Sequence, residues 1–207
     1  LDAIPRDRVR DVVVVDNGSS DGTPEVAAEH GAIVVHEFRR GYGSACLKGI
    51  ATLREQACRP DVVVFLDGDF SDHPEELPLV VGPIHRDEAE LVIGSRALGQ
   101  AEAGALLPQQ RFGNALASWL LRRLHGLEVT DLGPFRAIRW QTLERLNMAD
   151  PDFGWTAEMQ VKAARMGVRY VEVPVSYRRR IGTSKIAGTV QGTIRAGWKI
   201  LSIVLSR

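Results

Sequence analysis

The feature that most constrains the fold is the apolar run Val62–Leu66, which leads directly into the acidic residues Asp67, Asp69 and Asp72. A short uninterrupted apolar run is typical of a strand buried on both faces, as in a parallel sheet. Open α/β sheets bind ligands at the carboxyl ends of their strands, where these acids lie. The alternative is an acidic turn before a helix that begins at Pro74, since Asp and Gly are common turn residues.

The two acids nearest the strand favour a metal ion. Asp67 and Asp69 flank Gly68, so their side chains can converge on one point with little steric hindrance. Carboxylate oxygens suit a divalent cation such as Mg²⁺ or Mn²⁺, which proteins often share with the phosphates of a substrate. We therefore predict Asp67 and Asp69 as metal ligands.

Three further strand patterns support a ligand site over a simple turn. They cover Asp11–Asp16, Ala32–His36 and Glu90–Arg96, and the first leads into a Gly- and Asp-rich turn with Thr23 as the expected N-cap of a helix. Strands that alternate with helices predict an α/β protein with a mostly parallel, layered sheet. Right-handed crossovers then bring the strand ends to one edge. The side chains expected there are Asp16, Asp67, Asp69 and Arg96.

Two helices and one loop carry further signals. A helix is predicted over 108–125, with Leu116, Trp119, Leu120 and Leu124 as its apolar stripe. Arg111 lies in its first turns, where a cation opposes the macrodipole, so it meets either a phosphate or solvent. The loop Arg39–Ser44 opens another helix and is a weak candidate for anion binding.

The last predicted helix, about 189–205, is amphipathic. Its apolar residues recur every three or four positions beside basic ones, a pattern that suits an interfacial membrane helix, a packing helix or a dimer contact. The stripe comprises Val190, Ile194, Trp198, Leu201 and Leu205.

Composition adds few constraints. A chain of 207 residues suits one domain over 1–207, and Lys plus Arg equals Asp plus Glu at 26 each, so global charge gives no argument for a nucleic-acid partner. Cys46 and Cys58 lie twelve apart in one predicted helical region, off a common bridging face, which favours a reduced, cytoplasmic setting. No apolar run is long enough for a membrane-spanning helix. The chain begins at Leu1 without a methionine, which suggests a fragment.

Taken together, the motifs resemble inverting family 2 glycosyltransferases of the GT-A fold, a Rossmann-like three-layer α/β sandwich, and more closely the dolichyl-phosphate mannosyltransferase-like branch. The resemblance spans almost the whole chain, and its specificity lies in the order and spacing of the pieces. They are Val15–Thr23, Arg40–Gly43, Asp67–Asp69, Gly94–Arg96, Arg111 with Asn114, Asp131–Arg136 and Arg180–Lys185.

The resemblance implies a role for each matching residue. Asp16 and Asn17 would bind the nucleotide part of the donor, and Asp67 and Asp69 would hold the cation that bridges its diphosphate. Arg96 and Arg111, with Asp69, would be catalytic, and the two arginines would hold phosphate, including that of a lipid-phosphate acceptor. A late loop would close over the diphosphate through Arg180, Ser184 and Lys185.

The chain also departs from the family pattern. It starts after the strand with which the family normally opens, so that first strand is missing from the sequence as written. Ser71 stands where some relatives carry a polar amide near the metal. These departures leave a weaker metal site, or a nucleotide-sugar-binding module without turnover, as alternatives, whereas the retained Asp67, Asp69, Arg96 and Arg111 favour an enzyme.

The expected activity is therefore transfer of a sugar from a UDP- or GDP-sugar to a polyprenyl or dolichyl phosphate, with peripheral contact at the inner face of the membrane. A lipid phosphate is already ionised near neutral pH and needs no strong base. The alternative is transfer to a saccharide hydroxyl in surface-polysaccharide synthesis, which requires a general base, and Asp131 and Glu158 are the candidates.

Overall fold

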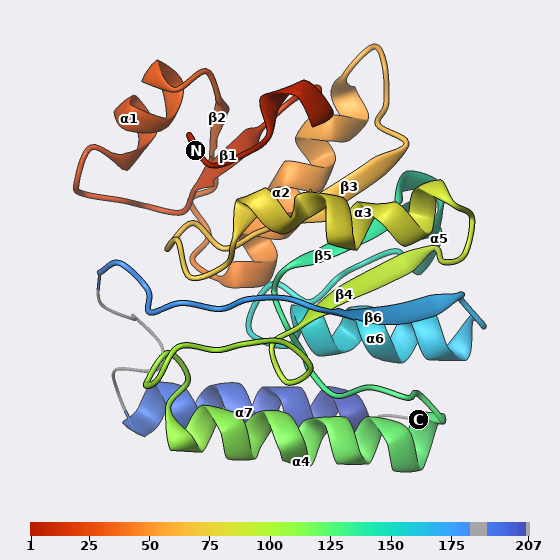
Figure 1. Cartoon of the computed structure of the whole chain (residues 1–207). Helices are drawn as coiled ribbons and strands as arrows, with labels where there is room; N and C mark the ends of the chain where they lie inside the picture. The colour runs from red at the N-terminus through yellow and green to blue at the C-terminus, as the bar shows by residue number, and fades with distance from the viewer. Residues whose placement is uncertain (183–189, 206–207) are drawn as a thin grey trace.

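The structure is a computed structural model that describes residues 1–182 and 190–205, with side chains for 1–182 and 196–205. It is an α/β protein, as expected, with strands and helices that alternate through most of the chain (Figure 1). The elements are β1 (Val13–Asp16), α1 (Thr23–Glu29), β2 (Ile33–His36), α2 (Tyr42–Glu55), β3 (Val62–Phe65), α3 (Leu77–His85), β4 (Leu91–Ser95), α4 (Pro108–His125), β5 (Arg136–Arg139), α5 (Trp140–Leu146), α6 (Trp155–Arg165), β6 (Tyr170–Pro174) and α7 (Val190–Leu205), with 3-10 turns at Arg6–Arg8 and Pro74–Glu76.

The described strands form two sheets. β1 pairs with β2 in parallel, and a second sheet has the order β3-β5-β4-β6. In that sheet β4 and β6 are parallel, whereas β5 runs antiparallel to both β3 and β4. The expectation of parallel strands therefore holds for every neighbour pair except those of β5. Because β5 runs the other way, it begins beside the carboxyl ends of β3 and β4, which brings the loop before it to the same edge as Asp67 and Arg96.

The second sheet is buried on both faces, as the apolar run at Val62 predicts. Successive residues of a strand point to opposite faces, and β4 shows this clearly. Leu91 and Ile93 belong to the cluster with Trp155 and Met159 of α6, whereas Val92 belongs to the cluster with Val80 of α3. The sheet is thus the middle layer between α3 on one side and α5 with α6 on the other, and its carboxyl edge is the open one.

The helices α4 and α7 form an outer layer beyond α6 and pack against each other (Figure 1). The residues of α4 that enter the core are Ala117, Ser118 and Leu121. The predicted stripe is therefore wrong in part, because Trp119 and Leu124 are exposed and Leu116 and Leu120 are only half-buried. Small residues at the buried positions allow the close approach of α7, and this depends on the neighbouring helix rather than on the apolar period.

Two local expectations are also wrong. The N-cap of α1 is Gly22 in the left-handed region (φ 71°), and Thr23 is already helical, so no side-chain hydroxyl caps this helix. The helix predicted to start at Pro74 begins as a 3-10 turn and becomes α-helical only at Leu77. Proline suits the first turn of either helix type, since its missing N–H would be unpaired there in any case.

Candidate active site

Three loops meet at the carboxyl edge of the second sheet, and they carry most of the predicted site residues. They are the acidic loop 66–73 after β3, the loop 96–107 after β4, and the extension of β6 through residues 175–182, all drawn on the left in Figure 1. The loop 126–135 before β5 ends at the same edge, since Arg136 pairs with Phe65 at the end of β3.

Asp67 and Asp69 are held differently within the acidic loop. Asp69 accepts hydrogen bonds on Oδ1 from the amide of Ser71 (3.0 Å) and its hydroxyl (2.5 Å), while Oδ2 forms an ion pair with Nη2 of Arg180 (2.9 Å). Burial, reinforced by the charge of Asp69, raises the pKa of Asp67 to about 6 against the opposing charges of Arg96 and Arg180. The burial of Asp67 beside Asp69 therefore disfavours its charged form.

The extension of β6 lies along the acidic loop and fixes its backbone. Tyr177 and Asp72 form an isolated antiparallel bridge, the amide of Arg178 donates to the carbonyl of Ser71 (2.9 Å), and the amide of Ile181 donates to that of Asp69 (2.9 Å). This pairing brings Arg180 to Asp69, so a predicted donor-binding residue already contacts a predicted metal ligand.

Arg178 holds the acidic loop through its side chain as well. Its Nε donates to the carbonyl of Phe70 (2.8 Å), its Nη2 donates to the carbonyl of Asp72 (2.9 Å), and its guanidinium lies 3.6 Å from the centroid of the Phe70 ring. Phe70 has φ 60°, a left-handed conformation that costs energy in a residue with a Cβ. Arg178 therefore positions the loop that presents both acids, a role that the sequence analysis does not assign to it.

Asp72 is a third acid of this loop, and sequence analysis assigns it no separate role. Its side chain is fully buried, Oδ1 has no hydrogen-bond partner among the described residues, and Oδ2 lies 3.5 Å from the amide of Asp67. Burial, together with the charge of Asp67, raises its pKa to about 7. The described residues contain no cluster of three or more acid, His or Cys side chains arranged to bind a metal.

Arg96, predicted to hold phosphate, forms a buried bidentate pair with Asp131. Nε donates to Oδ2 (2.8 Å), Nη2 donates to Oδ1 (2.7 Å), and the amide of Arg96 also donates to Oδ2 (2.8 Å). The guanidinium stacks 4.9 Å from the ring centroid of Tyr177. Asp131 is therefore occupied by three donors from one residue, and its geometry does not suit a free general base.

The loop before β5 is positioned by two polar side chains from other elements. Asn114 of α4 donates to the carbonyl of Thr130 (3.1 Å) and accepts from the amide of Leu132 (2.9 Å). Glu172 of β6 accepts from the amides of Thr130 and Asp131. Asn114 therefore holds the loop that carries Asp131 in place, a positioning role that its pairing with Arg111 in the sequence does not reveal.

Glu158, the other candidate base, is also occupied. Its carboxylate accepts from the amides of Ala149 and Asp150 and forms an ion pair with Lys162 one turn later (2.8 Å). These contacts tie the start of α6 to the loop before it.

The first sheet carries the two predicted nucleotide ligands. Asp16 ends β1, and its carboxylate accepts from the amide of Ser19 (2.8 Å) and contacts Nδ1 of His36 (3.2 Å). The hydrogen bonds from Ser19 are the main reason that its pKa falls to about 2, so it is ionised at neutral pH. The side-chain amide of Asn17 donates to the carbonyls of Glu37 and Arg39 and accepts from the amide of Gly41. Asn17 therefore shapes the loop 37–41.

The glycine loop before α2 is a packing contact. Gly41 has φ 144°, and a Cβ at Gly43 would lie 2.0 Å from the carbonyl of Asp150. The amide of Ser44 donates to the carbonyl of Pro151 (2.8 Å) and that of Gly41 to Asn17. Because acceptors within the protein already take the amides of Gly41 and Ser44, these two donors are not free to bind an anion.

Three predicted site residues are not among those that meet at the sheet edge. Arg111 is exposed on the second turn of α4. Ser184 and Lys185 lie outside the described residues. A buried acid near a strand end and an arginine beside an aromatic residue are the signals that point to Asp72 and Arg178, but both patterns are common and only the fold brings them together.

The donor set fits a divalent cation shared with a diphosphate. Asp67 and Asp69 supply hard oxygen ligands, and the pKa of Asp67 is raised by its burial and by the neighbouring charge of Asp69. Mg²⁺ and similar ions are often bound by one or two carboxylates with the remaining ligands from substrate phosphates and water. Asp67 and Asp69, without a cluster of three such ligands among the described residues, match that mode.

Comparison with known proteins is consistent with this architecture. Residues 6–147 match the model of glycosyl transferase family 2. An uncharacterised glycosyltransferase of Mycobacterium tuberculosis is 40% identical over 195 residues, which cover 92% of this chain and 85% of the relative. The undecaprenyl-phosphate mannosyltransferase of Micrococcus luteus is 33% identical over 202 residues, covering 92% and 80%. A dolichyl-phosphate hexose transferase of Haloferax volcanii is 34% identical over 187 residues, covering 87% and 77%.

A solved structure supports the fold. The glucosyl-3-phosphoglycerate synthase of M. tuberculosis, crystallised with Mn²⁺, uridine diphosphate and glucosyl-3-phosphoglycerate, superposes with a TM-score of 0.72 at 23% identity, covering 99% of this chain and 72% of that one. The family match and the identities above 30% show the family, and this superposition shows the fold. The chain belongs to glycosyltransferase family 2 and has the GT-A fold.

Proposed function

We propose that this glycosyltransferase moves a sugar, with inversion, from a UDP- or GDP-sugar to a polyprenyl or dolichyl phosphate, using Mg²⁺ or Mn²⁺. We also propose that residues 1–207 act as a single domain at the cytoplasmic face of a membrane. None of the described helices is long and apolar enough to cross a bilayer.

The choice of acceptor rests on one observation, which is that both candidate bases are already engaged in hydrogen bonds and ion pairs. Asp131 is bound by three donors of Arg96, and Glu158 is bound by two amides and Lys162. A sugar hydroxyl needs a base to remove its proton. A phosphate monoester attacks as an anion, so positioning and charge compensation suffice. Asp72 has a raised pKa, but its side chain is fully buried and cannot reach an acceptor hydroxyl.

The residues that would compensate charge surround the acidic loop. As the sugar leaves, negative charge grows on the diphosphate, and preorganised donors stabilise it. The cation held by Asp67 and Asp69 would supply part of this stabilisation when bound. Arg180, now paired with Asp69, would turn toward the diphosphate once the cation neutralises the acid, and its planar fork matches phosphate oxygens. We place Ser184 and Lys185 in the same role, and Arg96 and Arg111 on the acceptor phosphate.

The donor base would lie against the first sheet. Asp16 is ionised and held by Ser19 at the end of β1, which suits an acceptor of hydrogen bonds from a base or ribose. Asn17 would act indirectly through the loop 37–41.

The names of two relatives, which transfer sugars to undecaprenyl and dolichyl phosphate, support the lipid-phosphate acceptor. The solved synthase was crystallised with a phosphoglycerate product, also a phosphate-bearing molecule, but at an identity that supports the fold alone.

Transfer to a saccharide hydroxyl remains the second candidate, and a binding module without turnover is the third. Ser71 motivates the third, because its hydroxyl donates to Asp69 and so lowers the electron density available to a metal.

The test combines donor binding with transfer. Thermal unfolding is measured with UDP, GDP and their sugar conjugates, each with and without Mn²⁺; a ligand at a hundredfold excess over its Kd stabilises the fold by about 2.7 kcal/mol. Transfer of a radiolabelled sugar is then measured to a polyprenyl phosphate and to a saccharide. We expect a metal-dependent shift with one nucleotide and product only with the lipid phosphate.

The decisive variant is Asp69→Asn, with Asp61→Asn as the matched control because Asp61 is exposed just before β3. We expect Asp69→Asn to fold, to lose the metal-dependent shift and to lose transfer, while the control keeps both. Full activity of Asp69→Asn overturns the metal role, product with the saccharide alone selects the second candidate, and binding without any product selects the third.

A further inference from the structure

We infer that His36, at the end of β2, determines which base the nucleotide donor carries, because its Nε2 accepts a hydrogen bond from a ring N–H of the base. The matching bases are uracil and guanine. Asp16 is the positioning residue of this pair, since it fixes the tautomer of the imidazole. This inference deepens the proposed donor site and rests on it.

The carboxylate of Asp16 is already occupied and nearly closed to solvent. Its Oδ1 accepts from the amide of Ser19 (2.8 Å), and its Oδ2 contacts Nδ1 of His36 (3.2 Å). A hydrogen bond from the amide of Gly18 adds to these contacts. The side chain of Asp16 is 8% exposed, whereas that of His36 is 55% exposed. A ligand at this strand end therefore meets the imidazole before the carboxylate.

The carboxylate decides which nitrogen of the imidazole carries the proton. Hydrogen bonds from Ser19 are the main reason that the pKa of Asp16 falls to about 2, so at neutral pH this side chain can only accept. Nδ1 of His36 must then donate, and in a neutral imidazole the other nitrogen is an acceptor. Nε2 has no hydrogen-bond partner among the residues that the structure describes. The pair therefore presents one exposed lone pair at the end of β2.

The backbone holds His36 in a fixed position beside Asp16. The two residues are partners in the parallel register of β1 and β2. The amide of Glu37 donates to the carbonyl of Asp16 (2.9 Å), and the side chain of Asn17 donates to the carbonyl of Glu37 (2.8 Å). An acceptor that is already held in place loses little conformational entropy when a ligand binds.

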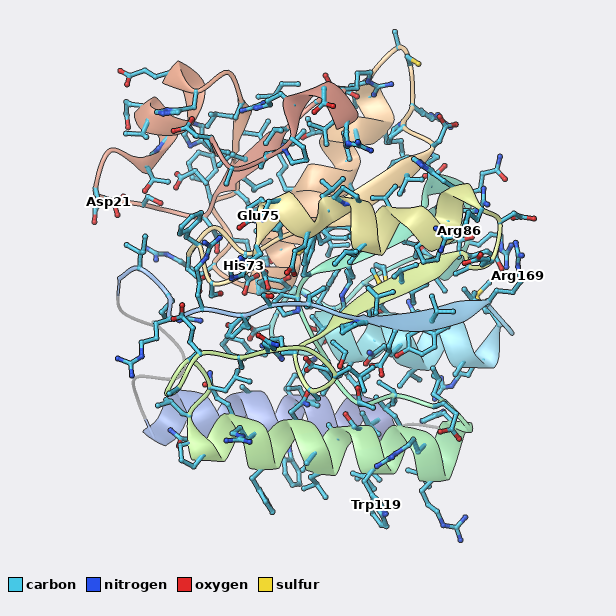
Figure 2. All side chains as sticks on the ribbon, viewed as in Figure 1. Asp21, His73, Glu75, Arg86, Trp119 and Arg169 are labelled. Atoms are coloured by element: carbon cyan, nitrogen blue, oxygen red, sulfur yellow. The ribbon has the colours of Figure 1, made fainter. Side chains whose placement is uncertain are left out.

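Local charge favours a base over a phosphate as the group that meets His36. Asp16 is ionised, and a second acid, Glu37, follows His36 directly in the chain. Acids beside the acceptor repel phosphate oxygens and leave a neutral N–H as the better partner. Asp21, the acid of the turn after β1, lies at the outer tip of that turn (Figure 2), where its carboxylate accepts from the hydroxyl of Thr23 (2.5 Å).

A single lone pair distinguishes bases of nearly the same shape. Uracil has an N–H at N3 and guanine has one at N1, whereas cytosine and adenine carry a lone pair at the same ring positions. That lone pair faces the lone pair of Nε2 and gains no hydrogen bond. One net hydrogen bond changes affinity by up to about tenfold. UDP with CDP, and GDP with ADP, are therefore matched pairs that differ at the position read by His36.

The experiment is isothermal titration calorimetry of the full chain with UDP, CDP, GDP and ADP in the presence of Mg²⁺. It is done at pH 8, where an imidazole is neutral. We expect UDP to bind about tenfold more tightly than CDP, or GDP than ADP, and the pair that shows the preference identifies the base. His36→Phe keeps a ring but removes the acceptor, so the preference should disappear. The control is His30→Gln, because His30 is exposed at the end of α1 and should keep the preference.

Asp16→Asn tests the tautomer itself. The carbonyl oxygen of the new side chain is taken by the amides that Asp16 binds now, so its NH₂ group faces His36. Nδ1 then accepts, the proton lies on Nε2, and Nε2 becomes a donor. The preference within the matched pair should therefore reverse. If Asp16 were only structural, the affinity for all four nucleotides would fall alike.

The outcomes separate this inference from the proposed function. Equal affinities within both matched pairs overturn the inference, and so does a preference that His36→Phe retains, although nucleotide binding still supports the proposed donor site. Equal weakening of both members of a pair in His36→Phe assigns the imidazole to the ribose or to packing and also overturns the inference. If the wild type binds none of the four nucleotides, the proposed function and the inference both fail.

Discussion

The ion pair between Arg96 and Asp131 gives the sharpest test of the proposed acceptor. Asp131 is 1% exposed and accepts three hydrogen bonds from Arg96, at 2.7 to 2.8 Å. In Asp131→Asn the side chain keeps its size but loses its charge, and its NH₂ group faces the N–H groups of Arg96. A mostly buried guanidinium is then left without its carboxylate.

The expected cost follows from that burial. Removing one partner of a buried ion pair costs about 3–5 kcal/mol, because the other charge remains desolvated. This is a large share of a total stability of about 5–15 kcal/mol. For a chain of this size the melting temperature should fall by roughly 6–20 °C. If Asp131 were instead a general base, the variant would fold normally and transfer would fall about 10²–10⁴-fold.

Urea unfolding followed by circular dichroism measures this difference, with Glu128→Gln as the control because Glu128 is exposed in the same loop. The double variant Arg96→Met/Asp131→Leu should recover much of the lost stability, since an apolar pair of similar volume often replaces a buried ion pair without loss. An Asp131→Asn variant within 1 kcal/mol of the wild type would refute the structural role, and selective loss of transfer in that variant would support the saccharide acceptor.

Two further variants test the acidic loop. Arg178→Met removes two hydrogen bonds to carbonyls and the contact with Phe70, so it should lower the free energy of unfolding by roughly 2–4 kcal/mol. Hydrogen exchange at the amides of residue 178 and Ile181 should become faster, and unchanged exchange at these amides contradicts the positioning role. Asp72→Asn tests the raised pKa of about 7. A raised carboxyl pKa stabilises the fold fully below the ordinary value of 3.8, and this stabilisation is lost as pH rises through about 7. Without metal, the wild type should therefore lose stability between pH 4 and pH 7 more steeply than Asp72→Asn in urea unfolding, and parallel curves contradict the assignment.

Much of the site could be predicted from strand ends. Val62–Leu66 and Glu90–Arg96 are apolar runs with polar ends, and the fold does bring Asp67, Asp69 and Arg96 to one edge of a sheet. The reversed direction of β5 could not be predicted, because a four-residue strand carries no signal of its direction. That reversal places Asp131 beside Arg96.

The roles of individual polar groups depended on partners far along the chain. Asn17, Asn114 and Glu158 are polar residues in family-like motifs, yet their side chains bind backbone groups or an ion-pair partner in the structure. A hydrogen bond has a range of about 3 Å, so its partner is decided by packing and not by local sequence. For the same reason the pairing of Arg178 with Phe70, over a separation of 108 residues, was not predictable.

The sequence by itself determined the α/β class, the helix over 108–125, the acidic strand end and the family resemblance, because these depend on periodicity and on the order of short motifs. The tertiary structure decided which side of α4 is buried, which acids are paired and which arginine positions the acidic loop. The physical reason is that burial and charge pairing are properties of neighbours in space: α7 covers Ala117 and Leu121 and leaves Trp119 outside, and the period of the helix is the same in either case.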